Sequence, residues 1–272
     1  MSGPIAIIAG EGALPVEIAT SLSNQGRDFL LAEMEGHPAE NPNRAPVIRF
    51  RVERMGSLFA QLHRQGVKEI VMAGAIHRPK LDPSKFDLKT VSLAPKLFSA
   101  LRQGDDGALR AVVAIFEAEG FDIRAAHDFV PNLVLPPGLT AGPGLSNELI
   151  ADATRGKAIL DALAGQDVAQ ACVIAGGQCL GIESVYGTDA LLKFVTDQRP
   201  NRRPETGGVL VKRPKTGQEL RVDMPVIGIS TIEAALAAKL SGVCLAAGQV
   251  MVLDCPAVAS LCDREGISLW AI

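Results

Sequence analysis

The sequence predicts an α/β protein made of two α/β domains, the first of them Rossmann-like, with the active site in the cleft between them. In the first half of the chain, short apolar runs rich in β-branched residues alternate with stretches of helical spacing, a pattern typical of a parallel sheet. At 272 residues, of which 47% are hydrophobic, the chain is long enough for two cores of ordinary size. Residues 131–146 are rich in proline and glycine and lack apolar periodicity. We therefore predict domains at residues 1–132 and 148–272, joined by a linker at 133–147.

The elements of the first half follow from this alternation. Residues 4–10 are an apolar run that predicts the first strand, and helical spacing follows through Ser23. Gly120 stops a later helix, because glycine is favoured just past a helix end. The remaining elements expected here are strands at 29–34, 69–73 and 121–126, and helices at 57–65, 93–102 and 106–119.

The second half predicts a further alternation of helices and strands. Residues 148–164 have amphipathic spacing, and two apolar runs turned by Gly176 and Gly177 predict paired strands at 171–175 and 179–183. The other elements expected are helices at 188–196, 231–241 and 256–264, and strands at 208–211, 226–229, 243–246, 250–254 and 267–271.

Composition excludes several classes of protein. A net charge of −3 argues against a general nucleic-acid binder, which carries a basic face. No apolar stretch reaches the roughly 18 residues that span a bilayer, and the N-terminus lacks the pattern of a signal peptide. The five cysteines are odd in number and lack close paired spacing, which favours reduced, mostly buried thiols. We therefore predict a cytoplasmic protein that does not bind nucleic acid.

The loop between the first strand and the first helix is a candidate site for a nucleotide or phosphate. Glycines let the backbone approach a ligand, and free amides at a helix start favour an anion. The loop lacks the third glycine of the dinucleotide fingerprint and the Lys-Ser/Thr pair of a Walker loop, so a tight turn remains the alternative. The residues expected to contact a substrate here are Gly10, Glu11, Gly12, Ala13 and Leu14.

Two more segments of the first half add candidate contacts. Because ligands collect at the carboxyl ends of parallel strands, the loop with His77 and Arg78 should lie beside the first loop. Arg78 is suited to a phosphate, while His77 could donate to it or be an ordinary surface histidine. Asp105 and Asp106 begin a helix, where one aspartate suffices as a cap, so the other is available for a ribose hydroxyl or a metal.

Three carboxylates of the second half form a candidate metal set. Glu183 ends a predicted strand, Asp189 lies in the first turn of the next helix, and Asp223 stands where a later apolar run begins. Such an oxygen-only set is what Mg²⁺ or Mn²⁺ prefers. The alternative is that Thr188 caps the helix and Asp189 stabilises its dipole, while Asp223 only caps a strand.

A group of cations precedes Asp223. Lys212, Arg213 and Lys215 would neutralise a diphosphate during displacement, which is the main demand of phosphoryl chemistry. A solvated hairpin is the alternative for this segment. The sequence has no Gly-x-Ser-x-Gly elbow and no cysteine in an evidently electropositive setting, so water is the expected nucleophile.

These segments, together with several others, carry a family resemblance. The segments are Ile8-Ala9-Gly10-Glu11-Gly12-Ala13-Leu14-Pro15-Val16-Glu17, Ala73-Gly74-Ala75-Ile76-His77-Arg78-Pro79, Gly104-Asp105-Asp106, Glu119-Gly120-Phe121, Ala126-His127, Glu183 with Gly187-Thr188-Asp189, and Arg221-Val222-Asp223-Met224-Pro225. In this order and at consistent spacing, over nearly the whole chain, the sequence resembles the LpxI-type UDP-2,3-diacylglucosamine pyrophosphatases.

The resemblance implies a Mg²⁺-dependent hydrolase of lipid A biosynthesis. Such an enzyme splits the pyrophosphate of UDP-2,3-diacylglucosamine with water, giving UMP and 2,3-diacylglucosamine 1-phosphate (lipid X), with attack at the sugar-side phosphorus. Asp223 matches the family's essential aspartate, for which metal binding is implied. Glu11 stands where a glycine is common and His77 at a variable position, so their contacts stay open. Thr188 and Asp189 are taken as further substrate contacts.

The implied substrate also predicts a location and partners. A UDP-linked diacylated glucosamine places the protein in the cytoplasm, with a peripheral position at the inner face of the inner membrane as the finer expectation. The sequence leaves a homo-oligomer open.

Two other classes of function remain as alternatives. An NAD(P)-dependent oxidoreductase would use the first strand–loop–helix unit, but its glycine fingerprint is incomplete and no clear acidic residue ends the second strand at the expected offset, where Glu33 or Glu35 is the nearest candidate. A non-catalytic module that binds a nucleotide or a lipid would need Asp223 only as a turn cap.

Overall fold

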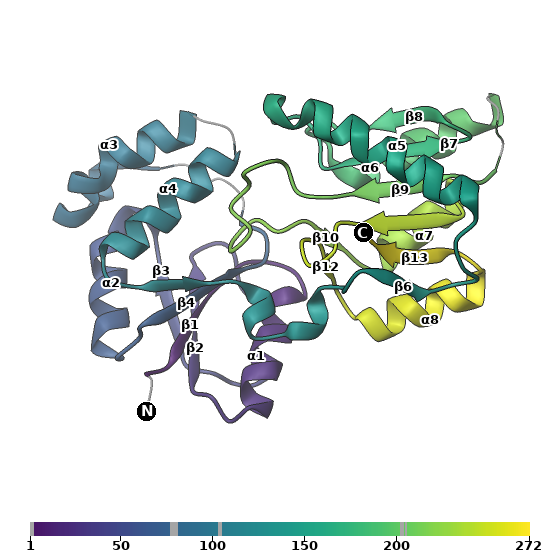
Figure 1. The fold of residues 1–272 in the computed structure, drawn as a ribbon. Helices are drawn as coiled ribbons and strands as arrows, with labels where there is room; N and C mark the ends of the chain where they lie inside the picture. The colour runs from purple at the N-terminus through teal and green to yellow at the C-terminus, as the bar shows by residue number, and fades with distance from the viewer. Residues whose placement is uncertain (1–2, 77–80, 103–104, 202–203, 205) are drawn as a thin grey trace. The chain divides into compact units, whose positions relative to one another are not determined.

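The computed structural model divides into two units, each with its own α/β architecture (Figure 1). It describes residues 3–76, 81–102, 105–201, 204 and 206–272. Unit 1 consists of Met1–Pro131 and Glu219–Asp223, and unit 2 consists of Asn132–Gln218 and Met224–Ile272. The chain therefore leaves unit 2 once, for five residues, before it returns.

The strands of unit 1 form a sheet in which every neighbouring pair is parallel, in the order β3-β2-β1-β4-β5. This is the strand order of Rossmann folds, so the prediction of a Rossmann-like first domain is confirmed. The strands are β1 (Ile5–Ala9), β2 (Phe29–Met34), β3 (Val47–Phe50), β4 (Glu69–Ala73) and β5 (Asp122–Arg124). The helices are α1 (Leu14–Asn24), α2 (Met55–Arg64), α3 (Leu88–Arg102) and α4 (Asp105–Ala118).

Both faces of this sheet are covered, as the apolar character of its strands requires. Successive residues of a strand face opposite sides. Ala6 and Ile8 of β1 join one core cluster with α2 and α4, including Leu58 and Phe116. Ile5 and Ile7 are fully buried too and face the other side, where α1 packs against β1. The run of buried residues in β1 is thus explained by two covered faces.

The main sheet of unit 2 is mixed, in the order β6-β13-β11-β9-β7-β8. Its centre, β9, β11 and β13, is parallel, while β6 and β7 run antiparallel to their neighbours. A second, two-stranded parallel sheet contains β10 and β12. The strands are β6 (Gly138–Ala141), β7 (Ala171–Ala175), β8 (Gln178–Ile182), β9 (Val209–Lys212), β10 (Val226–Ile227), β11 (Gly242–Leu245), β12 (Met251–Val252) and β13 (Ser268–Ala271). The helices are α5 (Asn147–Leu163), α6 (Gly187–Gln198), α7 (Ile229–Ala237) and α8 (Cys255–Glu265).

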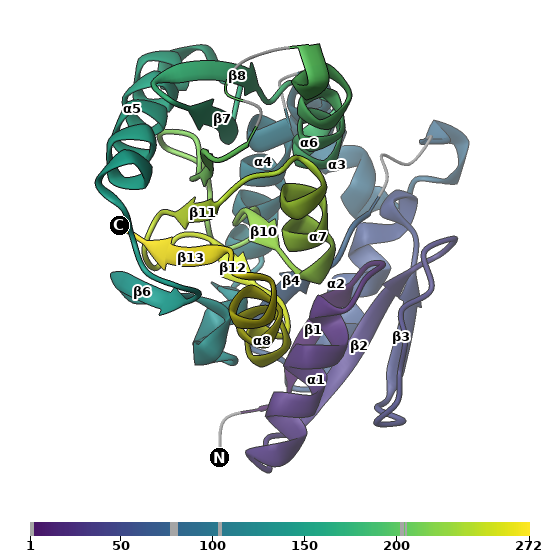
Figure 2. The ribbon, with the colours of Figure 1, turned by 90° about the vertical axis from the view of Figure 1, so that its right-hand side faces the viewer.

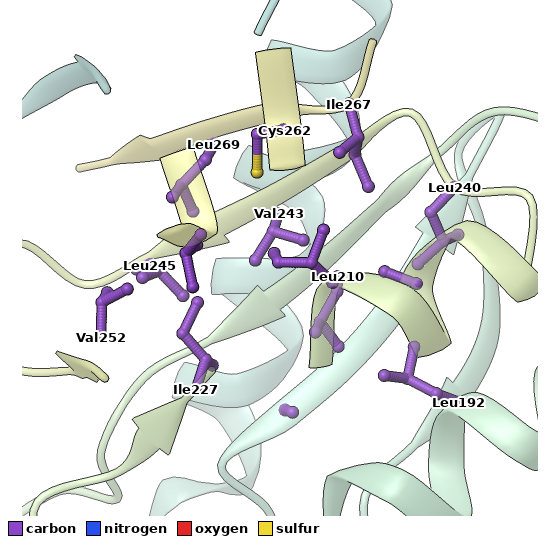
Figure 3. Close-up of a cluster of buried hydrophobic side chains, with 14 of the residues drawn as sticks. Leu192, Leu210, Ile227, Leu240, Val243, Leu245, Val252, Cys262, Ile267 and Leu269 are labelled. Atoms are coloured by element: carbon purple, nitrogen blue, oxygen red, sulfur yellow. The ribbon is translucent and has the colours of Figure 1, made fainter. Parts of the chain in front are cut away.

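Helices lie on both sides of the main sheet of unit 2, and Figure 2 shows α5 on one side with α6 and α7 on the other. The α5 side buries Trp270 with Leu149 and Leu160. The opposite side is the larger core, in which strand residues meet α6, α7 and α8 (Figure 3). Labelled members of this core include Leu192, Leu210, Val243, Leu245, Cys262 and Leu269.

The cysteines behave as small apolar residues. All five lie within the described residues and are unpaired, and Cys172, Cys244 and Cys262 are buried in the cores of unit 2. Burial raises the pKa of Cys172 and of Cys244 to about 12, so these thiols stay protonated and inert.

The structure contains two strands that the sequence pattern does not predict, β3 and β6. Each has four residues and lies at the edge of its sheet. In β3 alternate residues are exposed, and β6 lies inside the proline- and glycine-rich segment. Residues 133–147, which the sequence indicated as a linker, thus belong to unit 2 and contribute β6 to its sheet. An edge strand is held by its partner's hydrogen bonds, which its own short sequence does not reveal.

Several element boundaries also differ from expectation, and two of these differences have a visible local cause. Helix α3 begins at Leu88, five residues before the predicted start, because Asp87 caps it by accepting from Thr90 N at 2.7 Å. The expected strand at 226–229 is shorter, since β10 ends at Ile227 and Gly228 is the N-cap of α7.

Candidate functional site

The loops that follow β1 and β4 are joined to each other by backbone hydrogen bonds. Gly10 N donates to Ala73 O at 2.8 Å, and Glu11 exchanges two bonds of 2.9 Å with Ala75. These strands are the neighbours at which the strand order reverses, where ligands bind in open α/β sheets. The structure therefore brings the first predicted loop beside the start of the second.

The hydrogen bonds between these two loops determine which backbone amides of the first loop remain available to a ligand. A Cβ at Gly10 would lie 2.4 Å from Ala75 O, so glycine is required there. The amides of Gly10 and Glu11 already donate to carbonyl oxygens at the end of β4 and in the loop that follows it, so they cannot bind an anion. Within the described residues, the amides of Gly12, Ala13 and Leu14 have no hydrogen-bond acceptor, and they stand at the start of α1. The predicted anion site is thus narrowed to these three positions.

Three other predicted contacts of unit 1 cannot be placed. His77 and Arg78 lie outside the described residues. Asp105 is described only as the first residue of α4. Their contacts with substrate stay predictions.

In unit 2, three of the predicted site residues form one buried network. Lys212, the last residue of β9, donates from Nζ to Thr188 Oγ1 at 2.7 Å. Thr188 in turn donates to Glu183 Oε1 at 2.8 Å. Lys212, Thr188 and Glu183 have exposed fractions of only 7%, 8% and 8%. Buried charges are tolerated where they are paired and hydrogen-bonded, so the three residues depend on one another.

The network gives Lys212 an unusual electrostatic setting. Burial lowers the pKa of the Lys212 ammonium, while the negative charges of Glu183 and Asp189 oppose that change. The desolvation effect is the larger of the two. Lys212 therefore loses its proton at a lower pH than a surface lysine does.

Thr188 does not have the capping role that the sequence left open for it. The N-cap of α6 is Tyr186, and no side chain caps the helix there. The Thr188 hydroxyl is used instead to join Lys212 to Glu183, a pairing across the fold that the local sequence pattern cannot reveal. Asp189 is exposed in the first turn of α6, where its charge suits the helix dipole.

Two glutamines extend this network and were not expected from the sequence. Gln170 N donates to Glu183 Oε2 at 3.0 Å, and Gln170 Nε2 donates to Gln218 Oε1 at 3.0 Å. Lys215 N donates to the same oxygen of Gln218 at 2.9 Å. The end of β8 is thus connected to the loop that follows β9. Glutamine is common on surfaces, so the sequence carries no signal for these positions.

Arg213 and Lys215, the other two cations that precede Asp223, have acidic partners on the surface of unit 2. Arg213 pairs with Asp161 of α5, and Lys215 Nζ lies 2.9 Å from Asp167 Oδ1. Ion pairs of this kind contribute little stability, about 0–1 kcal/mol, so a phosphate could replace the carboxylates at small cost.

Asp223 belongs to the short segment that packs with unit 1. Arg221 holds this segment through Glu219 and through Glu117 of α4, at 2.7 Å in each case. The hydrogen bonds from Arg221 lower the pKa of Glu219. Val222 packs against the core cluster of unit 1, and Asp223 N donates to Glu219 O at 2.9 Å. Half-buried Asp223 thus ends a turn that is fixed on unit 1, and β10 begins three residues later.

Comparison with known proteins agrees with this two-unit organisation. A family model described as the LpxI N-terminal domain matches residues 4–133, and one described as the LpxI C-terminal domain matches residues 136–270. The chain belongs to the LpxI family. It is 34% identical over 271 residues to the UDP-2,3-diacylglucosamine pyrophosphatase LpxI of Caulobacter vibrioides, covering 98% of this chain and 97% of that protein. The resemblance read from the sequence motifs is thereby confirmed.

The LpxI domain models and the structural units differ by two residues at the domain boundary and by one separate segment. The C-terminal model includes Glu219–Asp223, whereas these residues pack with unit 1. The segment that carries Asp223 is therefore part of the C-terminal domain in sequence and of unit 1 in its contacts.

The predicted metal set of this LpxI family member consists of Glu183, Asp189 and Asp223. Among the described residues, no three histidine, cysteine, aspartate or glutamate side chains gather as a metal-binding group. Asp223 belongs to unit 1, while Glu183 and Asp189 belong to unit 2. Glu183 fits a dication poorly, because each of its oxygens already accepts a hydrogen bond and the Lys212 ammonium is nearby.

Proposed function

We propose that this protein hydrolyses the pyrophosphate of UDP-2,3-diacylglucosamine to UMP and 2,3-diacylglucosamine 1-phosphate. The observation that carries the proposal is the match to a UDP-2,3-diacylglucosamine pyrophosphatase over 98% of the chain. Both LpxI family models, which together span residues 4–133 and 136–270, support it. A Rossmann-like strand order by itself would not assign an activity, because that fold hosts many.

In this proposal Lys212 supplies positive charge to the reacting phosphate. A cation preorganised in a site of low water content stabilises developing negative charge more strongly than one in bulk water. Thr188 and Glu183 hold the ammonium in place and balance its charge. Lys215 and Arg213 would exchange their surface carboxylates for phosphate oxygens.

We further propose that the reaction depends on Mg²⁺ or Mn²⁺, with Asp223 as a ligand. The bound ion would supply charge that neutralises the phosphoryl oxygens. The oxygen chemistry of Asp223 fits such an ion. We assign Glu183 to the network of Lys212 instead of the metal, and we keep exposed Asp189 as a second candidate ligand.

The activity is tested by incubating purified protein with UDP-2,3-diacylglucosamine and Mg²⁺ in ¹⁸O-water, with and without EDTA, and analysing the products by mass spectrometry. We expect UMP and 2,3-diacylglucosamine 1-phosphate, abolished by chelation, with ¹⁸O in the sugar phosphate. Label in UMP would move the attack to the other phosphorus. Absence of turnover by folded protein would refute the proposed activity.

Asp223→Asn tests the role of the aspartate. Removing a metal-binding carboxylate takes away stabilisation of the transition state, so we expect kcat to fall by about a thousandfold or more. Substrate binding and the urea midpoint should stay near those of the wild type. Asp197→Asn is the matched control, because Asp197 is an exposed partner of Lys193 on α6. A variant that unfolds, or that retains its kcat, would make Asp223 a structural aspartate.

The acyl chains of the proposed substrate also require contact with a lipid surface. In the described part of the chain, no helix is both long and apolar enough to cross a membrane. Val185 and Tyr186, just before α6, have exposed fractions of 89% and 81%. Their exposure beside the buried network supports a peripheral contact of this loop with the membrane.

The membrane contact is tested by flotation with vesicles of bacterial phospholipid. The double variant Val185→Ser and Tyr186→Ser should float less than the wild type, because it has less apolar surface to insert. Val168→Ser, at a 46% exposed position, is the control and should float as the wild type does. Equal flotation of all three would exclude this loop.

A further inference from the structure

Gln170 lies at the end of the main sheet of unit 2 where Lys212, Arg213 and Lys215 follow one another along the chain. It comes directly before β7, which has β8 on one side and β9 on the other (Figure 1). Gln170 N donates to Glu183 Oε2 at 3.0 Å, and Gln170 O accepts from Arg213 N at 2.8 Å. The parallel strands β9, β11 and β13 finish at this same end, where ligands bind in α/β sheets. The main chain of Gln170 thus links the residue after β8 to the residue after β9.

The side chain of Gln170 contacts a second glutamine, in the loop that follows β9. Gln170 Nε2 donates to Gln218 Oε1 at 3.0 Å, and Lys215 N donates to the same oxygen at 2.9 Å. Because a backbone N–H can only donate, the atom of Gln218 that faces Lys215 is its oxygen, and Gln170 must therefore present its NH₂ group to that oxygen. Gln218 N donates back to Lys215 O at 3.2 Å, and Gln218 is only 9% exposed. The turn that begins at Lys215 is thus fixed to the sheet by one buried amide side chain.

This pair of glutamines fixes the turn without adding charge to it. Arg213 and Lys215 already have carboxylate partners, Asp161 and Asp167. A further carboxylate at position 218 would compete with a phosphate for the same cations, whereas a neutral amide supplies hydrogen bonds only. Lys215 Nζ can therefore exchange Asp167 for a phosphate oxygen while its own backbone stays in place. Groups that are held in place before a ligand arrives lose less freedom on binding, so they bind and stabilise charge more strongly.

We propose that Gln170 and Gln218 are positioning residues of the reaction, which hold the turn of Lys215 beside Lys212 and Arg213 so that the three cations act together on the diphosphate. The inference rests on the proposed function, because it takes the diphosphate of the substrate as the group that these cations bind. The two glutamines do not touch the substrate, and their side chains act through Lys215.

Replacing either glutamine by methionine removes the hydrogen bond between them with little change in side-chain volume. The first measurement is calorimetric titration of the full chain with inorganic pyrophosphate, which needs no turnover. We expect Gln170→Met and Gln218→Met each to weaken binding by about three- to tenfold, the effect of one lost hydrogen bond. The double variant should bind as Gln218→Met does, because both changes remove the same contact. Gln170 is less buried than Gln218, so Gln170→Met provides the test if Gln218→Met does not fold.

The variant Lys215→Met separates positioning from a merely structural role. If the glutamines act through Lys215, adding Gln218→Met to Lys215→Met should change the pyrophosphate affinity by less than about twofold. A structural defect would instead weaken binding equally in both backgrounds. Gln198→Met is the matched control, because Gln198 is an exposed glutamine at the end of α6, and it should bind as the wild type does. The urea midpoint of each variant shows that it is folded under the conditions of the titration.

Hydrolysis of UDP-2,3-diacylglucosamine gives the second measurement. Misplacement of a reacting group by about 1 Å can lower a rate a hundredfold, so we expect kcat/KM of Gln218→Met to fall by about ten- to a hundredfold. This fall should also disappear in the Lys215→Met background.

Three results would overturn the proposal: no binding of pyrophosphate by the wild type at millimolar concentration, wild-type affinity and kcat/KM in the folded glutamine variants, or an undiminished effect of Gln218→Met in the Lys215→Met background. The two measurements also separate this proposal from the proposed function. Weaker pyrophosphate binding in the variants without any hydrolysis by the wild type would keep the positioning role at an anion site and refute the activity. Hydrolysis that the glutamine variants leave unchanged would keep the activity and refute the positioning role.

Discussion

At the scale of single residues, Lys212 illustrates how burial changes the chemistry of a side chain. Its surface-exposed fraction is 7%, and burial lowers its pKa from the ordinary value of 10.5. Between the lowered folded value and the unfolded value, the unfolded chain binds more protons, so stability rises with pH in that window. Below the window the ammonium is charged in both states, and the folded protein carries the cost of burying it. Glu183 and Thr188 reduce that cost, which is consistent with a charge retained for function.

The pH dependence of hydrolysis tests this role of Lys212. If the ammonium form serves the reaction, kcat/KM should fall as the pH rises through the lowered pKa, at a pH below 10.5. Lys212→Arg keeps its charge beyond pH 12, so we expect a lower rate but no alkaline decline in this range. Lys193→Arg, at an exposed site paired with Asp197, should keep the wild-type profile. An unchanged decline in Lys212→Arg would assign the titration to another group.

At the scale of elements, α5 approaches the sheet of unit 2 closely, and a glycine makes this possible. Gly156 is in the middle of α5, where glycine costs about 1 kcal/mol relative to alanine, so a packing reason is expected. A Cβ at this position would lie 2.6 Å from Val211 Cγ2 and 3.2 Å from Cys172 Sγ. The helix is therefore placed against β7 and β9 by the absence of a side chain.

Gly156→Ala should lower the free energy of unfolding by about 1–3 kcal/mol, because the added methyl overpacks the contact and outweighs the gain in helix propensity. The measurement is the urea midpoint at constant m-value. Gly165→Ala is the matched control, since no atom lies within 4 Å of the Cβ it would add. Equal midpoints for Gly156→Ala and the wild type would show that α5 can shift without cost.

At the scale of the whole molecule, the path of the chain couples the two units. Five residues from the second half of the sequence, Glu219–Asp223, pack with unit 1. Val222 contacts the unit 1 core, and Arg221 pairs with Glu117. The aspartate for which we propose a metal role is thus positioned by unit 1, although it follows Lys212 by only a short loop of unit 2.

Val222→Ala should therefore loosen unit 1, although the residue lies in the second half of the sequence. Removing part of a half-buried apolar side chain costs about 1 kcal/mol. We expect faster hydrogen exchange in β1, β2 and β4, with β9 and β11 unchanged, measured by mass spectrometry of peptides. Val168→Ala, at an exposed position, should change neither unit. Faster exchange confined to unit 2 would contradict the assignment of this segment.

Features that depend on near neighbours along the chain could be predicted from the sequence. The alternation of apolar runs and helical stretches was enough to predict the parallel Rossmann-like sheet of unit 1 and the central strands of unit 2. A strand that is buried on both faces must be apolar along its whole length, and this makes it recognisable in the sequence. The order and spacing of motifs such as Gly10–Leu14 and Arg221–Pro225 were enough to identify the family. Lys212, Thr188 and Glu183 were also chosen from local signals at strand ends and helix starts.

The contacts that these residues make could be seen only in the folded chain. Thr188 joins Lys212 to Glu183 and caps no helix, and Gln170 and Gln218 enter the network through partners about 10 to 50 residues away. The edge strands β3 and β6 form because a neighbouring strand offers hydrogen bonds. The placement of Glu219–Asp223 on unit 1 depends on an ion pair spanning 104 positions. Such contacts arise from folding of distant segments, and no local pattern in the sequence encodes them.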